Sequence, residues 1–131
     1  MTQLNPRELD VLNILWKSEE PMMATDIVNA KLGLTQSTVT AVLRKLLNDN
    51  LVEVVGITHS GRVLSRTYRP AESSKELILK DFTDTYNSFS DVISESTMCV
   101  AILTENKSPE KAKAEIKKLK SLLSEYEKSL K

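Results

Sequence analysis

Residues 35–49 (TQSTVTAVLRKLLND) carry hydroxyl, amide and guanidinium groups at a spacing that suits contact with nucleic acid. If the stretch is a helix, at 100° per residue one arc of it is polar or small. That arc holds Ser37, Ala41, Arg44 and Asn48, with Thr38, Thr40 and Lys45 along its margins. Hydroxyl and guanidinium groups hydrogen-bond to phosphates and base edges, and a methyl group contacts thymine. The stretch is therefore predicted to be a recognition helix.

The opposite arc of the same stretch is apolar and is predicted to face a core. It holds Val39, Val42, Leu43, Leu46 and Leu47. Any amphipathic helix has a polar outer face where water meets it, so this pattern alone does not establish a binding function. Whether the polar face is a binding surface therefore has to be judged from the elements on either side of the helix.

A helix is predicted before this stretch, from Pro6 to about Lys17. Asn5 can cap it, Pro6 suits the first helical position, and Glu8 can bond back to the N–H of the cap. Its apolar residues are Leu9, Val11, Leu12, Leu15 and Trp16. This broad stripe is typical of a helix packed on two partners, and it makes Trp16 a predicted core residue.

A second helix is predicted over Ala24 to Lys31, after a short edge strand at Met22-Met23, and Gly33 ends it. Three or four residues then separate it from the TQST helix. That is the turn length of a helix-turn-helix unit.

A β-hairpin is predicted to follow. Leu51 to Val55 forms one strand, Gly56 to Gly61 a turn, and Arg62 to Arg69 the returning strand. Neither side of the second strand is purely apolar, so the side that packs inward stays open. We expect a mainly α fold with a small β wing, in which residues 1–70 form a winged helix-turn-helix domain.

The first 70 residues resemble the penicillinase-repressor family of bacterial winged-helix regulators. The family's N-terminal pattern is matched by Glu8-Leu9, Val11-Leu12, Leu15-Trp16 and Pro21. In its third-helix pattern Thr38 and Val39 match and Thr35 stands for a serine, whereas Ala41 replaces a threonine and Lys45-Leu46 replaces arginine-leucine. The resemblance implies a homodimeric transcriptional repressor that binds a pseudo-palindromic operator.

The tail, residues 71–131, is predicted to be a helical dimerisation region. Ile78, Phe82, Tyr86, Phe89 and Ile93 are expected to form one helical stripe, residues 98–103 are nearly all apolar, and a further stripe lies on a helix that Ser108-Pro109-Glu110 caps. About sixty residues of this kind do not easily enclose their own core. A second copy of the chain would cover them, although folding back on the winged domain is the alternative. The residues predicted at the interface are Ile78, Phe82, Phe89, Ile116, Leu119, Leu123 and Tyr126.

Composition is that expected of a cytoplasmic protein. The chain has one cysteine, no run long enough to span a membrane, and no charged-then-apolar leader, so we expect neither a disulfide framework nor membrane insertion. Its 18 basic and 18 acidic residues cancel, which argues against indiscriminate binding to nucleic acid. A modest basic excess between Thr35 and Pro70 falls on the proposed recognition helix and wing.

No residue pattern indicates catalysis, a metal or a cofactor. His59 is the only histidine, which excludes a site built from several histidines, and Cys99 lies in an apolar run where free cysteine behaves as a small hydrophobe. A glycine-rich phosphate loop is also missing. We therefore expect a protein that is not an enzyme and needs no cofactor.

Double-stranded DNA and a second copy of the chain are the expected partners, and nothing in the sequence identifies an upstream signalling partner. Base or near-base contacts are predicted for Ser37, Thr38, Ala41 and Arg44. Phosphate contacts are predicted for Thr35, Gln36, Thr40, Lys45, His59 and Arg62. The alternative is a winged-helix module that binds other proteins and has no sequence-specific DNA binding, which near-zero net charge keeps open.

Overall fold

The computed structural model describes residues 4–105 and 108–130, apart from the side chain of Ser60. Within them the elements run in the order α1 (Pro6–Lys17), α2 (Ala24–Ala30), α3 (Gln36–Asn48), β1 (Val52–Ser60), β2 (Val63–Pro70), α4 (Glu72–Asn87), α5 (Glu95–Thr104) and α6 (Pro109–Ser129). They divide into two compact units, Met1–Thr85 and Tyr86–Lys131. The predicted fold class, mainly α with a small β wing, is confirmed.

Helix α1 begins with the predicted capping box. Asn5 Oδ1 accepts a hydrogen bond from the Glu8 N–H at 2.9 Å, and the Asn5 N–H donates to Glu8 Oε1 at 2.9 Å. Pro6 occupies the first helical position, where a missing N–H costs nothing, and the helix ends at Lys17 as expected. The box satisfies two backbone N–H groups that the helix start leaves without partners.

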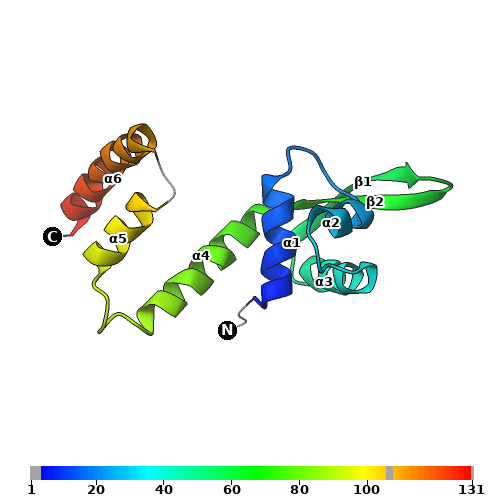
Figure 1. Ribbon diagram of the computed structural model, residues 1–131, viewed down its shortest axis with the longest axis horizontal. Coiled ribbons are helices and arrows are strands. Elements are labelled where there is room, and N and C mark those ends of the chain that lie inside the picture. Colours follow the sequence, from blue (N-terminus) through cyan, green and yellow to red (C-terminus); the bar gives the residue numbers. More distant parts are fainter. Residues whose placement is uncertain (1–3, 106–107, 131) are drawn as a thin grey trace. The chain divides into compact units, whose positions relative to one another are not determined.

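Helices α2 and α3 form the helix-turn-helix unit. Helix α2 ends at Ala30, one residue before the predicted end, and Gly33 takes a φ of +90° in the turn. Glycine adopts this left-handed backbone without strain. Leu34, at the end of the turn, is buried and helps to anchor it on the core. In Figure 1 α1, α2 and α3 lie together at the base of the hairpin, whose turn projects away from them.

The hairpin differs from its prediction, because Gly56 does not start the turn. Strand β1 continues to Ser60, and the chain reverses at Gly61 and Arg62, where Gly61 has a φ of +66°. A bulge at Val55 lies between the paired residues Val54 and Gly56, and Gly56 itself pairs with Thr67. A Cβ added to Gly56 would lie 3.1 Å from Thr67 Oγ1. An isolated glycine in a strand commonly marks such a bulge.

The predicted edge strand at Met22-Met23 is present as a single bridge to β2. The Met22 N–H donates to the Tyr68 oxygen at 2.9 Å, and the Tyr68 N–H donates to the Met22 oxygen at 2.8 Å. Tyr68 packs against the core, which settles the side of β2 that faces inward.

The core of the first unit lies between α1, α2, α3 and the base of the hairpin. Its buried members are Val11, Leu12, Leu15, Ile27, Leu34, Val39, Val42, Leu43, Leu46, Leu51 and Val52. Trp16, predicted as a core residue, is only partly buried and packs at the edge of this cluster.

The first part of α4 belongs to the same compact unit. Trp16 Nε1–H donates to Ser74 Oγ at 2.8 Å, and Ser74 is fully buried. Leu77 and Ile78 pack against the core. The first compact unit therefore includes the first part of α4, through the Trp16–Ser74 bond and the packing of Leu77 and Ile78.

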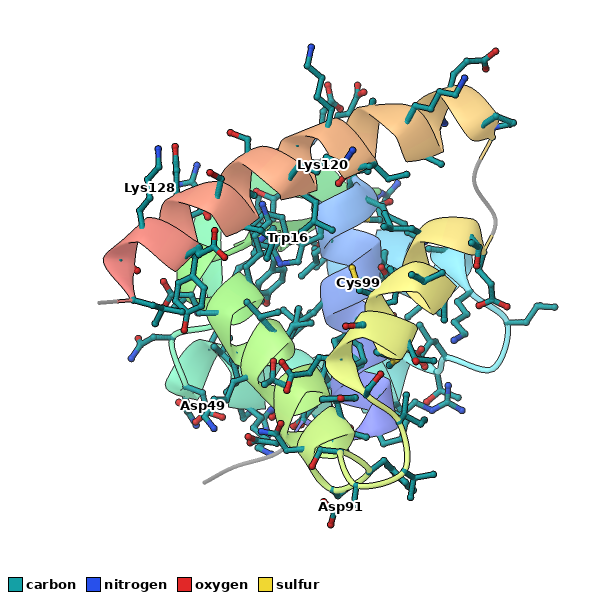
Figure 2. The ribbon with its side chains drawn as sticks, turned by 90° about the vertical axis from the view of Figure 1, so that its left-hand side faces the viewer. Trp16, Asp49, Asp91, Cys99, Lys120 and Lys128 are labelled. Atoms are coloured by element: carbon teal, nitrogen blue, oxygen red, sulfur yellow. The ribbon has the colours of Figure 1, made fainter. Side chains whose placement is uncertain are left out.

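The second unit contains α5 and α6, each begun by a serine cap. Ser94 Oγ accepts from the Thr97 N–H at 3.2 Å, and Ser108 Oγ accepts from the Lys111 N–H at 3.3 Å, as predicted for Ser108. Figure 2 shows Cys99 on α5 and both Lys120 and Lys128 on α6. The predicted stripe from Ile78 to Ile93 is wrong beyond Asn87, where α4 ends. Phe89 and Ile93 lie in the following turn, which the Tyr86 hydroxyl joins by donating to the Ile93 oxygen at 2.6 Å.

Candidate nucleic-acid interface

Helix α3 has the two faces that its periodicity predicts. Val39, Val42, Leu43 and Leu46 are buried against the core. On the other face the side chains of Ser37, Ala41, Arg44 and Asn48 are exposed, and so are those of Gln36 and Thr40. The helix thus presents a polar surface of short side chains with one guanidinium group.

The first turn of α3 is organised by the hydroxyl of Thr35. Thr35 caps the helix: its Oγ1 accepts from the Thr38 N–H at 3.2 Å and donates to Thr38 Oγ1 at 2.9 Å. Ser37 Oγ lies 3.3 Å from the same oxygen. The backbone N–H groups of Gln36 and Ser37 have no acceptor within the helix, and the positive end of the helix dipole lies there. This turn is therefore suited to a phosphate.

Lys45 is engaged within the chain. Its Nζ lies 2.8 Å from Oε2 of the buried Glu8, on the first turn of α1. The hydrogen bond to the Glu8 carboxylate is the main cause that raises the pKa of Lys45 above its ordinary value of 10.5. The sequence offered Lys45 as a phosphate contact, whereas the structure gives it a partner in the protein.

The hairpin carries further basic side chains, those of His59, Arg62, Arg66 and Arg69. Across the strands His59 is paired with Leu64 and Ile57 with Arg66, on the face that also bears Tyr68. His59 lies in β1 and not in the turn, where the sequence placed it; Arg62 lies in the turn itself. Arg69 Nε bonds to Glu53 Oε2 at 2.8 Å.

Arg66 was missing from the predicted contacts although it is exposed on the hairpin. Its positive charge, part of the basic excess on the predicted wing, was the signal that could have pointed to it. Once Lys45 is paired with Glu8 and Arg69 with Glu53, three arginines of α3 and the hairpin form no ion pair with any described residue. These are Arg44, Arg62 and Arg66.

Other kinds of site are not seen in the described part of the chain. Residues 4–105 and 108–130 contain no group of three or more His, Cys, Asp or Glu side chains placed to hold a metal ion. Among the same residues, no helix has both the length and the apolar composition needed to cross a bilayer.

A helix-turn-helix with an exposed polar second helix, followed by a β-hairpin with unpaired arginines, defines a winged-helix DNA-binding protein. The model of the penicillinase repressor family matches residues 4–125. The chain belongs to this family. It is therefore a DNA-binding transcriptional repressor and not an enzyme.

Solved structures of winged-helix regulators share the fold. A variant of MepR from S. aureus bound to an oligodeoxyribonucleotide is 20% identical, covers 98% of this chain and 80% of its own, and has a TM-score of 0.50. A transcriptional regulator from Thermotoga maritima is 20% identical over 96% of this chain and 78% of its own, with a TM-score of 0.51. No curated protein matches the sequence.

Proposed function

We propose that the protein acts as a homodimer on a pseudo-palindromic operator, with one α3 in each of two successive major grooves. The observation that carries this proposal is the exposed polar face of α3. Its side chains have no packing role, because the opposite face of the helix already supplies the contacts with the core. A recognition helix needs just such a free face.

Base contacts are assigned to Ser37, Thr38, Ala41 and Arg44. Arg44 suits the two acceptors of guanine, and the Ala41 methyl suits the methyl group of thymine. The Thr38 hydroxyl already accepts a hydrogen bond from the Thr35 hydroxyl. Its own O–H and second lone pair are left for a contact with a base.

Phosphate contacts are assigned to two places. At the start of α3 they come from Thr35, Gln36 and Thr40; on the hairpin they come from His59, Arg62 and Arg66, the last being added from the structure. Lys45 contributes positive charge to the flank of α3 while it stays bonded to Glu8. Contacts of this kind set the register of the protein on the duplex and make binding depend on salt.

The dimer is proposed because the second unit does not enclose a core. None of the described residues between 86 and 130 is buried, and α5 and α6 border an apolar groove of about 680 Å³. Phe89, Leu123 and Tyr126 are 54%, 55% and 62% exposed. Apolar surface of this extent on a small protein marks an interface, and two-fold pairing is the commonest way to cover it. Ile116 and Leu119 complete the proposed set. Of the other two residues predicted at the interface, Ile78 packs against the core of the first unit and Phe82 lines a cleft there, so we leave both out of it.

Selection from random duplexes tests this proposal. The purified protein is mixed with a library of randomised double-stranded DNA, and the bound fraction is sequenced after repeated rounds. We expect an inverted repeat whose half-site centres lie about 10 bp apart or a multiple of that. Enrichment of an unrepeated half-site would contradict the dimeric arrangement, and the absence of any enriched sequence would contradict specific recognition.

A further inference from the structure

A cleft of about 410 Å³ opens between α1 and α4 within the first unit, away from the proposed DNA contacts. Its lining consists of Leu9, Asp10, Asn13, Trp16, Lys75, Ile78 and Phe82. This volume lies in the range of small-molecule sites, which are mostly apolar with a few polar groups.

Lys75 supplies an uncompensated positive charge to this cleft. Its Nζ lies 4.5 Å from the centroid of the Trp16 ring, and it forms no ion pair with any residue that the structure describes. Asp10 is the only carboxylate of the lining, and its two oxygens are bonded to Lys31 at 2.6 Å and Arg7 at 3.2 Å. The cleft therefore offers a cation whose counter-ion must come from outside it.

The apolar wall beside Lys75 is held in place. Trp16, labelled in Figure 2, is fixed by its bond to Ser74, whose own hydroxyl donates to the Ala71 oxygen at 2.7 Å. Ile78 is half-buried and Phe82 is 62% exposed, so both have surface left for a ligand. A wall that is already ordered lowers the entropy cost of binding.

We propose that the cleft binds a small apolar monocarboxylate. The carboxylate pairs with Lys75 and the Asn13 amide, and the apolar body lies against Trp16, Ile78 and Phe82. Charge complementarity selects this class, since Lys75 is the one charged group of the lining without an ion-pair partner among the described residues: it repels a cation and can pair with one carboxylate. Such a ligand would join α1 to α4. Any effect of this ligand on operator binding rests on the function proposed above, whereas the binding of the ligand to the cleft does not.

Trp16 makes the test direct, because it is the only tryptophan of the chain and its indole N–H gives one assignable NMR signal. The full-length protein is titrated with cyclohexanecarboxylate and, separately, with cyclohexanecarboxamide, which has the same shape and no charge. The same titrations are run on Lys75→Gln and on Lys80→Gln. Lys80 is a matched control, because it lies on α4, is bonded to Asp84 at 2.8 Å and does not line the cleft.

We expect a saturable shift of the indole signal with the carboxylate. Binding should be about tenfold weaker or more for the amide and for Lys75→Gln, since each lacks one partner of a charge-assisted hydrogen bond. Lys80→Gln should bind as the parent does. An indole signal that does not respond to the carboxylate, or equal binding of acid and amide, would overturn the proposal. So would undiminished binding by Lys75→Gln. No DNA is present, so these results are independent of the operator.

Discussion

Glu8 and Lys45 form an ion pair that joins the first turn of α1 to the last part of α3, with Oε2 and Nζ 2.8 Å apart. The Glu8 side chain is 1% exposed and that of Lys45 is 48% exposed. The other oxygen of Glu8 accepts from the Asn5 N–H. One buried carboxylate therefore completes the cap of α1 and also holds the proposed recognition helix.

Replacing Lys45 with methionine should lower the melting temperature, because it leaves the buried Glu8 carboxylate without its cation. The double variant Glu8→Gln, Lys45→Met should melt above Lys45→Met alone. The amide oxygen of Gln can still accept from the Asn5 N–H and brings no buried charge. Thermal unfolding of both variants checks this, and a single variant as stable as the double one would contradict it.

Asp10 should make the stability depend on acid pH. The hydrogen bond from Lys31 is the main reason that the pKa of Asp10 lies below its ordinary value of 3.8; partial burial opposes it, and Arg7 lowers the pKa further. A carboxyl whose pKa is lowered by folding stabilises the protein above its unfolded pKa, and that stability is lost as the pH falls through the lower value.

The parent should therefore exceed Asp10→Asn in free energy of unfolding by about 0.2–1 kcal/mol at neutral pH, as expected for ion pairs at a protein surface. The difference should shrink below pH 3.8. Urea titrations between neutral and acid pH measure it. A difference that stays constant down to the lowest pH would show that the ion pair is not its source.

Much of the helix-turn-helix follows from local patterns. The capping box of Asn5 and Glu8 and the two faces of α3 depend on residues close in sequence, and both were predicted. The turn predicted to begin at Gly56 was wrong. Glycine is common both in turns and beside bulges, and only the pairing of Gly56 with Thr67 shows that the strand continues there. The ion pair of Lys45 was beyond prediction, since it joins residues far apart in the sequence whose closeness depends on helix packing.

Arg44 and Arg62 should differ in what their loss does to DNA binding. Arg44→Ala should cost about 1–3 kcal/mol on the selected operator and relax the base preference at one position per half-site. Arg62→Ala should weaken binding to all sequences alike and lower the salt slope by about one. Titrations on the operator and on single-base variants measure both effects. An equal loss of affinity on all sequences for Arg44→Ala would show that Arg44 does not recognise a base.

Leu123→Asp should separate the chains, because it places a charge in the apolar groove between α5 and α6. Leu123 is 55% exposed in the single chain, so the variant should keep its helices. Ser121→Asp, on the same helix and outside the groove lining, is the control. Sedimentation should show monomers for Leu123→Asp only, and its operator affinity should fall as the gain from two linked contacts is lost. A Leu123→Asp protein that stays dimeric would place the interface elsewhere.

Sequence-specific binding by two copies of α3 can be measured by a titration over several salt concentrations. The selected operator and a duplex of the same composition in scrambled order are compared, and sedimentation counts the chains on each duplex. We expect two chains on the operator and an affinity at least about a thousandfold above that for the scrambled duplex. The logarithm of the binding constant should fall linearly with that of the salt concentration. Equal affinity for both duplexes, or no binding to either, would contradict sequence-specific DNA binding and favour a winged-helix module that binds protein.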